Sequence, residues 1–460
     1  MKKLMLIALF TMSSLSVFAQ QEPWTLEQCV NYALENNISI QRNQLDVESA
    51  AVQTKAAKGN FLPNLNAGVN QSFSFGLNAG STGVATQNNR SNTGFNIGSS
   101  TTLFNGFRNS SEYKKAKLGN ELSQLALEKM ENDISLNVVN AYLNILFNRE
   151  NLEVAKIQAD ISKEQVKRIS ELFEAGSAPK GDLYEIEATL ANDVQNLITV
   201  ENSLNISRLN LAQILQIPYE NFDVADIDIE APSIALLEEE GSSEVYERAL
   251  QIMPEIKQAE LSYESTNYDV KIAKSGFMPS LNFNLGANTG YFYNYADIPI
   301  NPINNLPSFS DDQWNPSFGD QFKDNRNYSI SFGMNIPIFN RNQNKAAVKR
   351  AKLNQERSEL ALAEQKQNLY QSIESAFLDA QAAIKTFDAA KLSLKSQLEA
   401  FRNAEERFDL GVLTSYDFNL SRNGLVNAQA TLIRSKFDYI FKMKLLRFYY
   451  GEPIVGPNEL

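Results

Sequence analysis

Residues 64–77 read NLNAGVNQSFSFGL, and apolar residues alternate there with asparagine, serine or glycine at nearly every step. An alternation with period two is typical of a β-strand with one apolar face. The same alternation returns around residues 281–291 and 328–336, and more weakly around 95–103. Together the four stretches predict strands at about 63–78, 92–104, 280–293 and 326–339. Each is roughly as long as a tilted strand that crosses a bilayer.

The apolar face of these strands is predicted to contact lipid, because the opposite face carries small uncharged groups that suit a water-filled lumen. The lipid-facing residues that we expect are Phe73, Phe75, Phe283, Leu285, Ile330 and Phe332. A half-exposed strand of a soluble sandwich alternates in the same way, but the rest of this chain has helical patterns. Four strands are too few for a membrane barrel, which needs at least about eight. Since open sheet edges cannot face lipid, several copies of the chain must share one barrel.

An internal repeat organises the chain. Residues 57–66, AKGNFLPNLN, match residues 273–282, AKSGFMPSLN. This repeat predicts two halves, 20–240 and 241–451, followed by a tail at 452–460. Each half is expected to contain a helix, two strands, a long helix, a turn and another helix. The second half has about nineteen extra residues between its strands, which predicts an exposed loop within Asn294–Asp324.

The helices that follow the strand pairs are predicted to be long. Residues 109–174 contain no proline and a single glycine, and about 65 helical residues would extend roughly 100 Å. Apolar residues recur every seven positions in the last helix, at Phe418, Leu425, Leu432, Tyr439 and Leu446. This spacing indicates a coiled-coil seam. An ordinary cytosolic coiled coil is the alternative, and the interleaved strands argue against it.

Two turns divide these helices into antiparallel pairs. We expect them near residues 177–181 and 412–415, with Gly176 and Gly411 as the helix stops. The sequence around the first turn also matches the sequence around the second. Glu171, Phe173, Gly176 and Asp182 correspond to Glu406, Phe408, Gly411 and Asp417.

The residue composition and the first nineteen residues indicate where the protein is located and which kinds of chemistry it is not expected to perform. Residues 1–19 combine two lysines, an apolar run and a small-residue end, which predicts a secretory signal peptide. No later run is apolar enough for a membrane helix. A net charge of −12 argues against nucleic-acid partners. The chain has no histidine, one cysteine (Cys29) and no phosphate-binding loop motif, so we expect no catalytic site, metal or cofactor, and a buried Cys29.

Taken together, these features resemble the TolC family of outer-membrane efflux proteins. The similarity covers about residues 24–451. It rests on the opening WTLEQCVNYALENN at residues 24–37, the doubled strand start, and the doubled tip, FEAG at 173–176 and FDLG at 408–411. The resemblance implies a mixed fold, a long antiparallel coiled-coil helical barrel continuous with an outer-membrane β-barrel. It also implies a homotrimer with four strands per chain in one shared barrel and a long periplasmic extension.

The resemblance further implies a function and its partners. The trimer would be a passive conduit from the periplasm to the exterior, coupled to an inner-membrane pump through a periplasmic adaptor. In this family the adaptor meets the helical tips. The docking residues would therefore be Ala175, Gly176, Ser177, Leu410, Gly411 and Val412. Plain helix-turn residues are the alternative interpretation of these positions.

Members of the family narrow at the periplasmic end, often with a ring of aspartates. Asp417 matches that ring, and Asp182 is its partner in the first half. This chain departs from the pattern at Leu413, Leu420 and Phe408, where the family can have arginine, a second aspartate and tyrosine. A closed state held by apolar contacts is therefore expected. Asp417 also stands near a helix start, where it could act as a cap.

Two other functions compete with the conduit. One is an envelope-anchored coiled-coil scaffold without a transport role, and the other is an independent diffusion porin, which would not need helices of this length. The sequence carries no mark of the exported substrate or of the class of pump.

Overall fold

The computed structural model describes residues 23–79, 85–87, 90–226, 241–295 and 316–454. The expected signal peptide, most of the expected loop within Asn294–Asp324 and the end of the tail lie outside these residues. The described chain forms two compact units. A sheet unit comprises Val47–Ser123 and Glu260–Ala361. A helical unit comprises the described residues of Met1–Asp46, Gln124–Ala259 and Leu362–Leu460.

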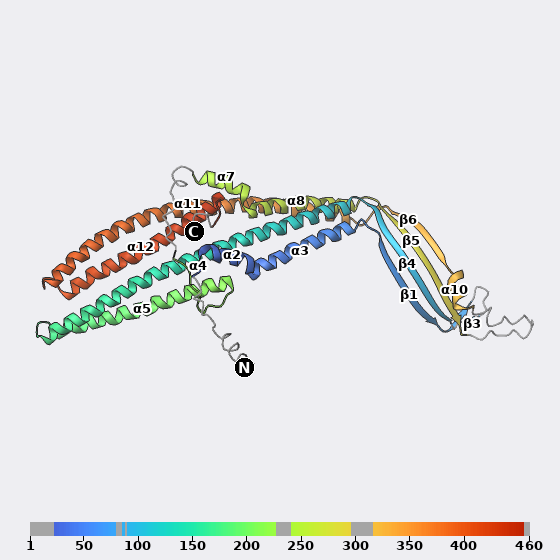
Figure 1. Ribbon diagram of the computed structural model, residues 1–460. Helices are drawn as coiled ribbons and strands as arrows, with labels where there is room; N and C mark the ends of the chain where they lie inside the picture. The colour runs from blue at the N-terminus through green and yellow to red at the C-terminus, as the bar shows by residue number, and fades with distance from the viewer. Residues whose placement is uncertain (1–22, 80–84, 88–89, 227–240, 296–315, 455–460) are drawn as a thin grey trace, which may run out of the picture. The chain divides into compact units, whose positions relative to one another are not determined.

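The sheet unit is built on four antiparallel strands in the order β1-β4-β5-β6 (Figure 1). Their bounds are β1 Asn64–Ser74, β4 Arg90–Asn105, β5 Ser280–Asn294 and β6 Asn327–Asn335. A separate short ribbon pairs β2, Leu77–Ala79, with β3, Ala85–Gln87. The four predicted strands are therefore present. Among the described residues, β1 and β6 each have a strand neighbour on one side only.

The strand register gathers the apolar residues on one face of the sheet. Phe283 lies opposite Phe332, with ring centroids 4.9 Å apart, and Leu285 lies opposite Ile330. The Ile330 and Phe332 side chains are 71% and 67% exposed in the single chain. Asparagine, serine, threonine and glycine alternate with them and form most of the opposite face. The asparagines of that face are Asn64, Asn66, Asn70, Asn92, Asn96, Asn105, Asn282, Asn284, Asn288, Asn294, Asn327 and Asn335.

Three strand details differ from the sequence prediction. The first strand ends at Ser74, four residues before the predicted end at 78. The pairing of β4 with β5 shifts between Thr102 and Phe104, so that Phe104, and not Leu103, lies opposite Leu281. Leu103 is the extra residue of this bulge, which no alternation pattern can reveal. The fourth strand ends at Asn335, four residues before the predicted end at 339. Pro337 follows it, and proline lacks the N–H that a strand ladder requires.

Four helices connect to the sheet, all at the same end. They are α3 (Ile38–Gly59), α4 (Arg108–Glu174), α8 (Pro254–Ser275) and α11 (Gln343–Asp409). Within the sheet unit, Lys115 of α4 forms a salt bridge with Asp269 of α8, and the Thr54 hydroxyl of α3 donates to the Ala116 carbonyl at 3.0 Å. A short helix, α10 (Phe318–Asp324), lies at the opposite end of the sheet (Figure 1).

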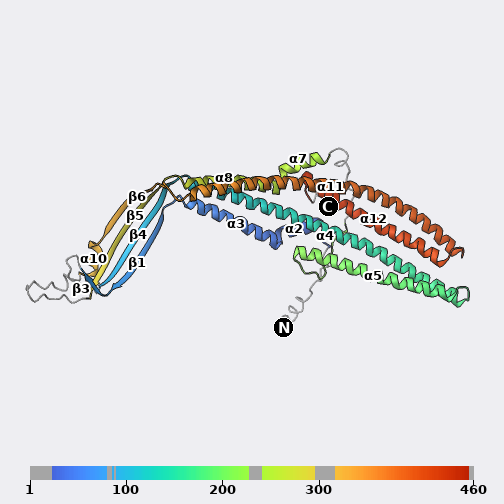
Figure 2. The same ribbon diagram turned by 180° about the vertical axis from the view of Figure 1, so that it is seen from behind.

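The helical unit contains two hairpins and two short helices. One hairpin joins α4 to α5 (Lys180–Leu215), and the other joins α11 to α12 (Ser415–Tyr450) (Figure 2). The short helices are α2 (Leu26–Asn36) and α7 (Ser242–Ile252). Corresponding helices of the two halves have equal lengths, 11 residues for α2 and α7, 22 for α3 and α8, 67 for α4 and α11, and 36 for α5 and α12.

The core of the helical unit has two large apolar clusters, and α12 contributes to both. Ile433, Phe437 and Ile440 pack with α2, α4 and α5, whereas Tyr439, Met443 and Leu446 pack with α7 and α11. The seven-residue seam predicted for α12 is therefore only part of its buried surface. The helix also buries residues between the seam positions, because it packs against partners on two sides.

Cys29 is fully buried in the first of these clusters. Burial raises the pKa of its thiol from about 9.0 to about 12, because the thiolate is poorly solvated there. The predicted role as a small buried residue is confirmed. Across the described residues, no helix combines the length and the apolar character needed to cross a membrane.

Candidate functional site

The tips of the two hairpins have the same backbone geometry. Gly176 and Gly411 adopt φ angles of 71° and 72°, in the left-handed region that glycine favours. Just beyond them, the Ser177 N–H donates to the Leu172 carbonyl at 2.8 Å, and the Val412 N–H donates to the Arg407 carbonyl at 2.9 Å. Both helices therefore end in the Schellman arrangement. The predicted helix stops at the two glycines are confirmed.

The residues predicted to dock an adaptor are exposed at these tips. Leu410 is 78% exposed and Val412 is 66% exposed. Ala175, Gly176, Ser177 and Gly411 are exposed as well. Single exposed apolar side chains are ordinary, whereas a contiguous apolar patch can mark a contact surface. The geometry is compatible with the docking role, which stays a prediction.

Asp417 is part of the N-terminal cap of α12. The Thr414 hydroxyl oxygen accepts from the Asp417 N–H at 3.2 Å, and the Thr414 hydroxyl donates to the Asp417 carboxylate at 2.8 Å. This arrangement satisfies one of the free N–H groups of the first turn. The carboxylate also remains on the surface. The capping role is therefore present, and it leaves the carboxylate where a ring of like charges could form.

Asp182 occupies the corresponding position of α5 in a different setting. Pro179 precedes this helix, and no side chain caps its first turn. The Asp182 N–H donates to the Pro179 carbonyl at 3.2 Å. The Asp182 side chain is half-buried, whereas Asp417 is exposed.

The three apolar residues predicted at the constriction are placed differently from one another. Phe408 stacks on Phe418, with ring centroids 4.5 Å apart, and Leu413 packs against the same small cluster. That cluster consists of Phe401, Phe418 and Leu425 and belongs to the α11–α12 hairpin. Leu420, by contrast, is 61% exposed. Phe408 and Leu413 therefore stabilise the tip from within, and Leu420 is the most exposed of the three.

A polar network that the sequence analysis missed links the two hairpins above their tips. Arg422 of α12 is almost fully buried, and one of its terminal nitrogens lies 3.0 Å from the Asp193 carboxylate of α5. Its other terminal nitrogen donates to the Ser162 hydroxyl of α4, which in turn donates to Asp193. Removing one member of such a buried pair typically costs about 3–5 kcal/mol. The sequence feature that could have revealed this network is Arg422 itself. It lies four positions after Phe418 and therefore on the same buried face of the helix.

In the sheet unit, the expected lipid-facing residues share one face as far as the strands extend. Phe73, Leu285, Ile330 and Phe332 are exposed there, and Phe283 is half-buried. Phe75 is 72% exposed but follows the end of β1 at Ser74.

Helix α10 is a second feature that the sequence analysis missed, because it lies in the expected loop. The Ser317 hydroxyl oxygen accepts from the Asp320 N–H at 3.2 Å and caps the helix. Gln321 then bonds to the free edge of β5 beyond the end of β6. Its side-chain amide accepts from the Phe292 N–H and donates to the Phe292 carbonyl, both at 2.9 Å. Ser317 followed three residues later by Asp320 is a capping signature that could have revealed the helix.

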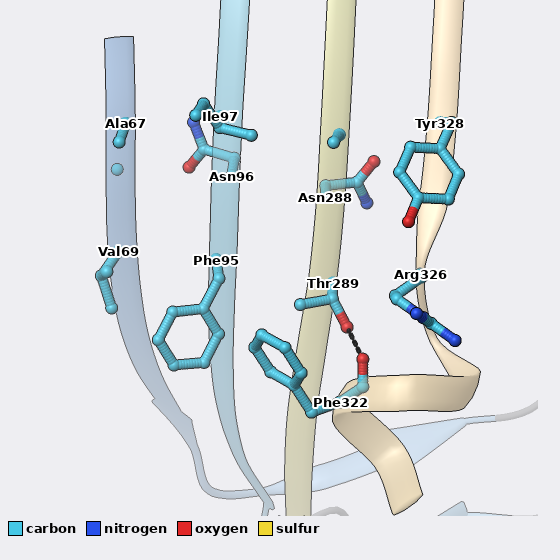
Figure 3. Close-up of a pocket in the computed structure, with 12 residues that line it drawn as sticks. Ala67, Val69, Phe95, Asn96, Ile97, Asn288, Thr289, Phe322, Arg326 and Tyr328 are labelled. Carbon is cyan, nitrogen blue, oxygen red and sulfur yellow. Dashed lines mark hydrogen bonds between the residues drawn. The ribbon is translucent and has the colours of Figure 1, made fainter. Parts of the chain in front are cut away.

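Beneath α10, the apolar face of the sheet has a groove of about 330 Å³ (Figure 3). The groove is lined by residues of all four strands, together with Phe322 of α10 and Arg326 just before β6. The Thr289 hydroxyl in this groove donates to the Phe322 carbonyl at 2.7 Å, which fixes the helix over the sheet (Figure 3). The Phe95 and Phe322 rings meet edge to face at 5.6 Å.

The sequence model of the family described as "Outer membrane efflux protein" matches residues 29–215 and 245–451. The chain is 26% identical to outer membrane protein TolC of Vibrio cholerae over 69% of this chain and 67% of that protein. It is 22% identical to outer membrane protein TolC of Escherichia coli over 98% of this chain and 87% of that protein.

Among solved structures, the fold is similar to the CmeC outer membrane channel of Campylobacter jejuni. The TM-score is 0.73 at 19% identity, over 93% of this chain and 85% of that one. At this level of identity the likeness concerns the fold alone.

Proposed function

Because the chain belongs to the outer membrane efflux protein family, we propose that it is the channel subunit of a tripartite efflux or secretion system in the cell outer membrane. In this proposal the chain is built from two structural repeats, and three copies form a passive conduit with a long periplasmic extension. An inner-membrane pump supplies the energy and acts through a periplasmic adaptor. The chain itself catalyses no reaction.

The observation that carries the proposal is the open sheet. Within the described residues it has four strands, one strongly apolar exposed face and two edges, β1 and β6, without an outer strand neighbour. Unpaired backbone groups at such edges are costly in lipid. Pairing of β6 with β1 of another copy would satisfy them, and the asparagine-rich face would then line the lumen.

The first experiment tests whether the apolar face contacts lipid. In the double variant Phe283→Arg with Ile330→Arg, each arginine should cost about 2–4 kcal/mol near the bilayer midplane, so we expect loss of the trimer from outer membranes. The matched control is Asn284→Arg with Ser331→Arg, which alters the neighbouring residues of the same strands on the opposite face. An unchanged trimer yield in the first variant would favour the scaffold function. Equal losses in both variants would contradict the assignment of faces.

The second experiment tests docking at the tips. Gly411→Trp should block export while the trimer still assembles, because it places a large side chain on the proposed adaptor surface. Gly411 has a positive φ, so this variant also strains the turn. Leu410→Trp adds similar bulk at an exposed position without that strain. Persistent export in both variants would overturn the docking assignment.

The third experiment concerns the proposed constriction, formed by Asp417 and Asp182 with Leu413, Leu420 and Phe408. A ring of carboxylates attracts cations and repels anions. Asp417→Asn should therefore lower the cation preference of the channel in planar bilayers, while its backbone N–H can still be capped by Thr414. Unchanged selectivity in both Asp417→Asn and Asp182→Asn would leave Asp417 with the capping role alone.

A further inference from the structure

We propose that the groove beneath α10 binds one acyl chain of an anionic lipid that carries phosphate, with the phosphate near Arg326. This inference rests on the proposed function, since it places the apolar face of the sheet in a bilayer. It adds a specific lipid site to a surface that otherwise contacts lipid without preference.

The shape of the groove follows from the strand register. Ala67, Ile97 and Ala287 lie directly opposite one another on β1, β4 and β5. The short side chains of the two alanines leave space above the sheet in this row, and larger side chains border that space. Phe95 and Phe322 close one end of the groove, and Tyr328 stands on the β6 side (Figure 3).

The lining of the groove suits hydrocarbon. Its surface is almost entirely apolar. The Thr289 hydroxyl is already bonded to the Phe322 carbonyl, so it does not require water. Binding an acyl chain there would remove apolar surface from contact with less well-packed lipid and would fill the space beneath the helix.

The charge at the rim selects the headgroup. Arg326 lines the groove and is exposed, and its Nε donates to the Lys323 carbonyl at 2.7 Å. The guanidinium has further N–H donors that suit a phosphate. Two carboxylates stand on α10, but neither lines the groove. The Asp320 carboxylate accepts from the Ser317 hydroxyl, and Asp324 lies at the end of the helix.

The position of the groove along the strands indicates which leaflet supplies the lipid. The long helices join the sheet at one end, and α10 lies at the other (Figure 1). With the helices in the periplasm, α10 and Arg326 are at the outer surface of the membrane. A cation at headgroup depth there meets the phosphates of the outer leaflet.

Lipid retention by the purified full-length chain tests the site. The assembled protein in detergent is given equal amounts of dimyristoylphosphatidylglycerol and dimyristoylphosphatidylcholine, and the bound lipids are counted by native mass spectrometry. We expect roughly fivefold preferential retention of the anionic lipid, the effect of one cation near a headgroup. Arg326→Gln should abolish the preference, and Ala287→Phe should reduce retention of both lipids by filling the groove.

Two matched variants separate these effects from general changes in the sheet. Arg90→Gln removes a cation that stacks on Phe292, 3.9 Å from its ring centroid, on the polar face of the sheet. Leu285→Phe enlarges a residue of the same strand and face that does not line the groove. Both variants should retain lipid as the unmodified chain does.

The proposal is overturned if Arg326→Gln keeps the lipid preference or if Ala287→Phe keeps full retention. It is also overturned if the groove is occupied by a second copy of the chain, which would give no retained lipid and cross-links between copies from Ala287→Cys. Conductance in planar bilayers separates the two levels of inference. A chain that conducts but shows no lipid preference contradicts the proposed lipid site alone. A chain that neither assembles nor conducts contradicts the proposed function.

Discussion

The tip between α4 and α5 and the tip between α11 and α12 have the same backbone but different side-chain support. Each helix ends at a glycine with φ near 70°, followed by equivalent backbone hydrogen bonds. The helix that begins after the second tip is capped by Thr414, whereas Pro179 supplies no side-chain cap at the first. The glycine therefore determines the turn, and the neighbouring residues can differ without altering it.

The two tips also differ in their apolar support. Phe418 is 1% exposed and packs with Phe401 and Leu425. Leu183, the residue that corresponds to Phe418 when Asp182 is aligned with Asp417, is half-buried. The second tip therefore has a small aromatic core of its own. If the proposed constriction lies there, this core provides a rigid base for it.

The largest expected effect comes from removing that aromatic core. Phe418→Ala should destabilise the second tip by about 3–5 kcal/mol, since it deletes a buried ring. Leu183→Ala should destabilise the first tip by less, because Leu183 is only half-buried. Hydrogen exchange of the first turns of α12 and α5 would measure both changes. Equal losses of protection would show that the two tips are supported alike.

The next largest loss of stability comes from replacing the turn glycines, and it should be equal at the two tips. Gly176→Ala and Gly411→Ala should each cost about 1–2 kcal/mol, because alanine is strained at positive φ. An added Cβ meets no atom within 4 Å at either position, so backbone strain alone is expected. Gly119→Ala in α4 is the control, and it should stabilise its helix by about 0.5–1 kcal/mol. Unequal costs in thermal or exchange measurements would contradict the equivalence of the two turns.

Loss of the cap should affect one tip only. Thr414→Ala should cost about 1 kcal/mol, since the Asp417 N–H loses its acceptor. Thr414→Ser keeps the hydroxyl and should retain most of the stability. Pro179→Ala, the matched change at the first tip, removes no cap. Exchange rates of the first-turn amides of α12 and α5 provide the measurement, and a similar loss from Pro179→Ala would reject the proposed difference.

The smallest effect on stability is expected at a buried position that α2 and α7 share. Cys29 of α2 and Val245 of α7 are equivalent positions, and both are fully buried. Cys29→Val should therefore change stability by less than about 1.5 kcal/mol. A larger loss in thermal unfolding would mean that the two short helices are packed differently.

The same residue gives a pH dependence with a definite sign. Burial raises the pKa of Cys29 from about 9.0 to about 12, so the folded state favours the protonated thiol. Stability contributed by this thiol is present below about pH 9 and falls as the pH rises toward 12. Cys29→Val should remove this alkaline loss. At neutral pH, alkylation of Cys29 followed by mass spectrometry should require opening of the helix, and rapid alkylation would contradict its burial.

Much of the fold was predictable because it follows from periodic patterns. Period two predicted the four strands, the absence of proline predicted the long α4, and Gly176 and Gly411 predicted the ends of α4 and α11. The features that were missed depend on single residues whose partners are distant in sequence. The bulge at Leu103, the buried Arg422 with Asp193 and the docking of Gln321 on β5 are of this kind.

The candidate site was predictable to a similar degree. The family pattern identified the tips and placed Asp417 near a helix start, where its cap was expected as an alternative. It could not indicate that Phe408 and Leu413 pack into their own hairpin while Leu420 stays exposed, because burial at a turn depends on the facing helix. The groove beneath α10 was not predicted, since it requires the register of β1, β4 and β5 together with a helix in the expected loop.

The amide of Gln321 has a consequence for how far the sheet can grow. It takes up the N–H and carbonyl of Phe292 that an added strand would otherwise use. A strand that would pair with β5 beyond the end of β6 at Asn327 therefore finds these two groups already bonded. Together with Asn325, which donates to the Gly290 carbonyl, Gln321 thus protects the outer end of β5 from pairing with a foreign strand.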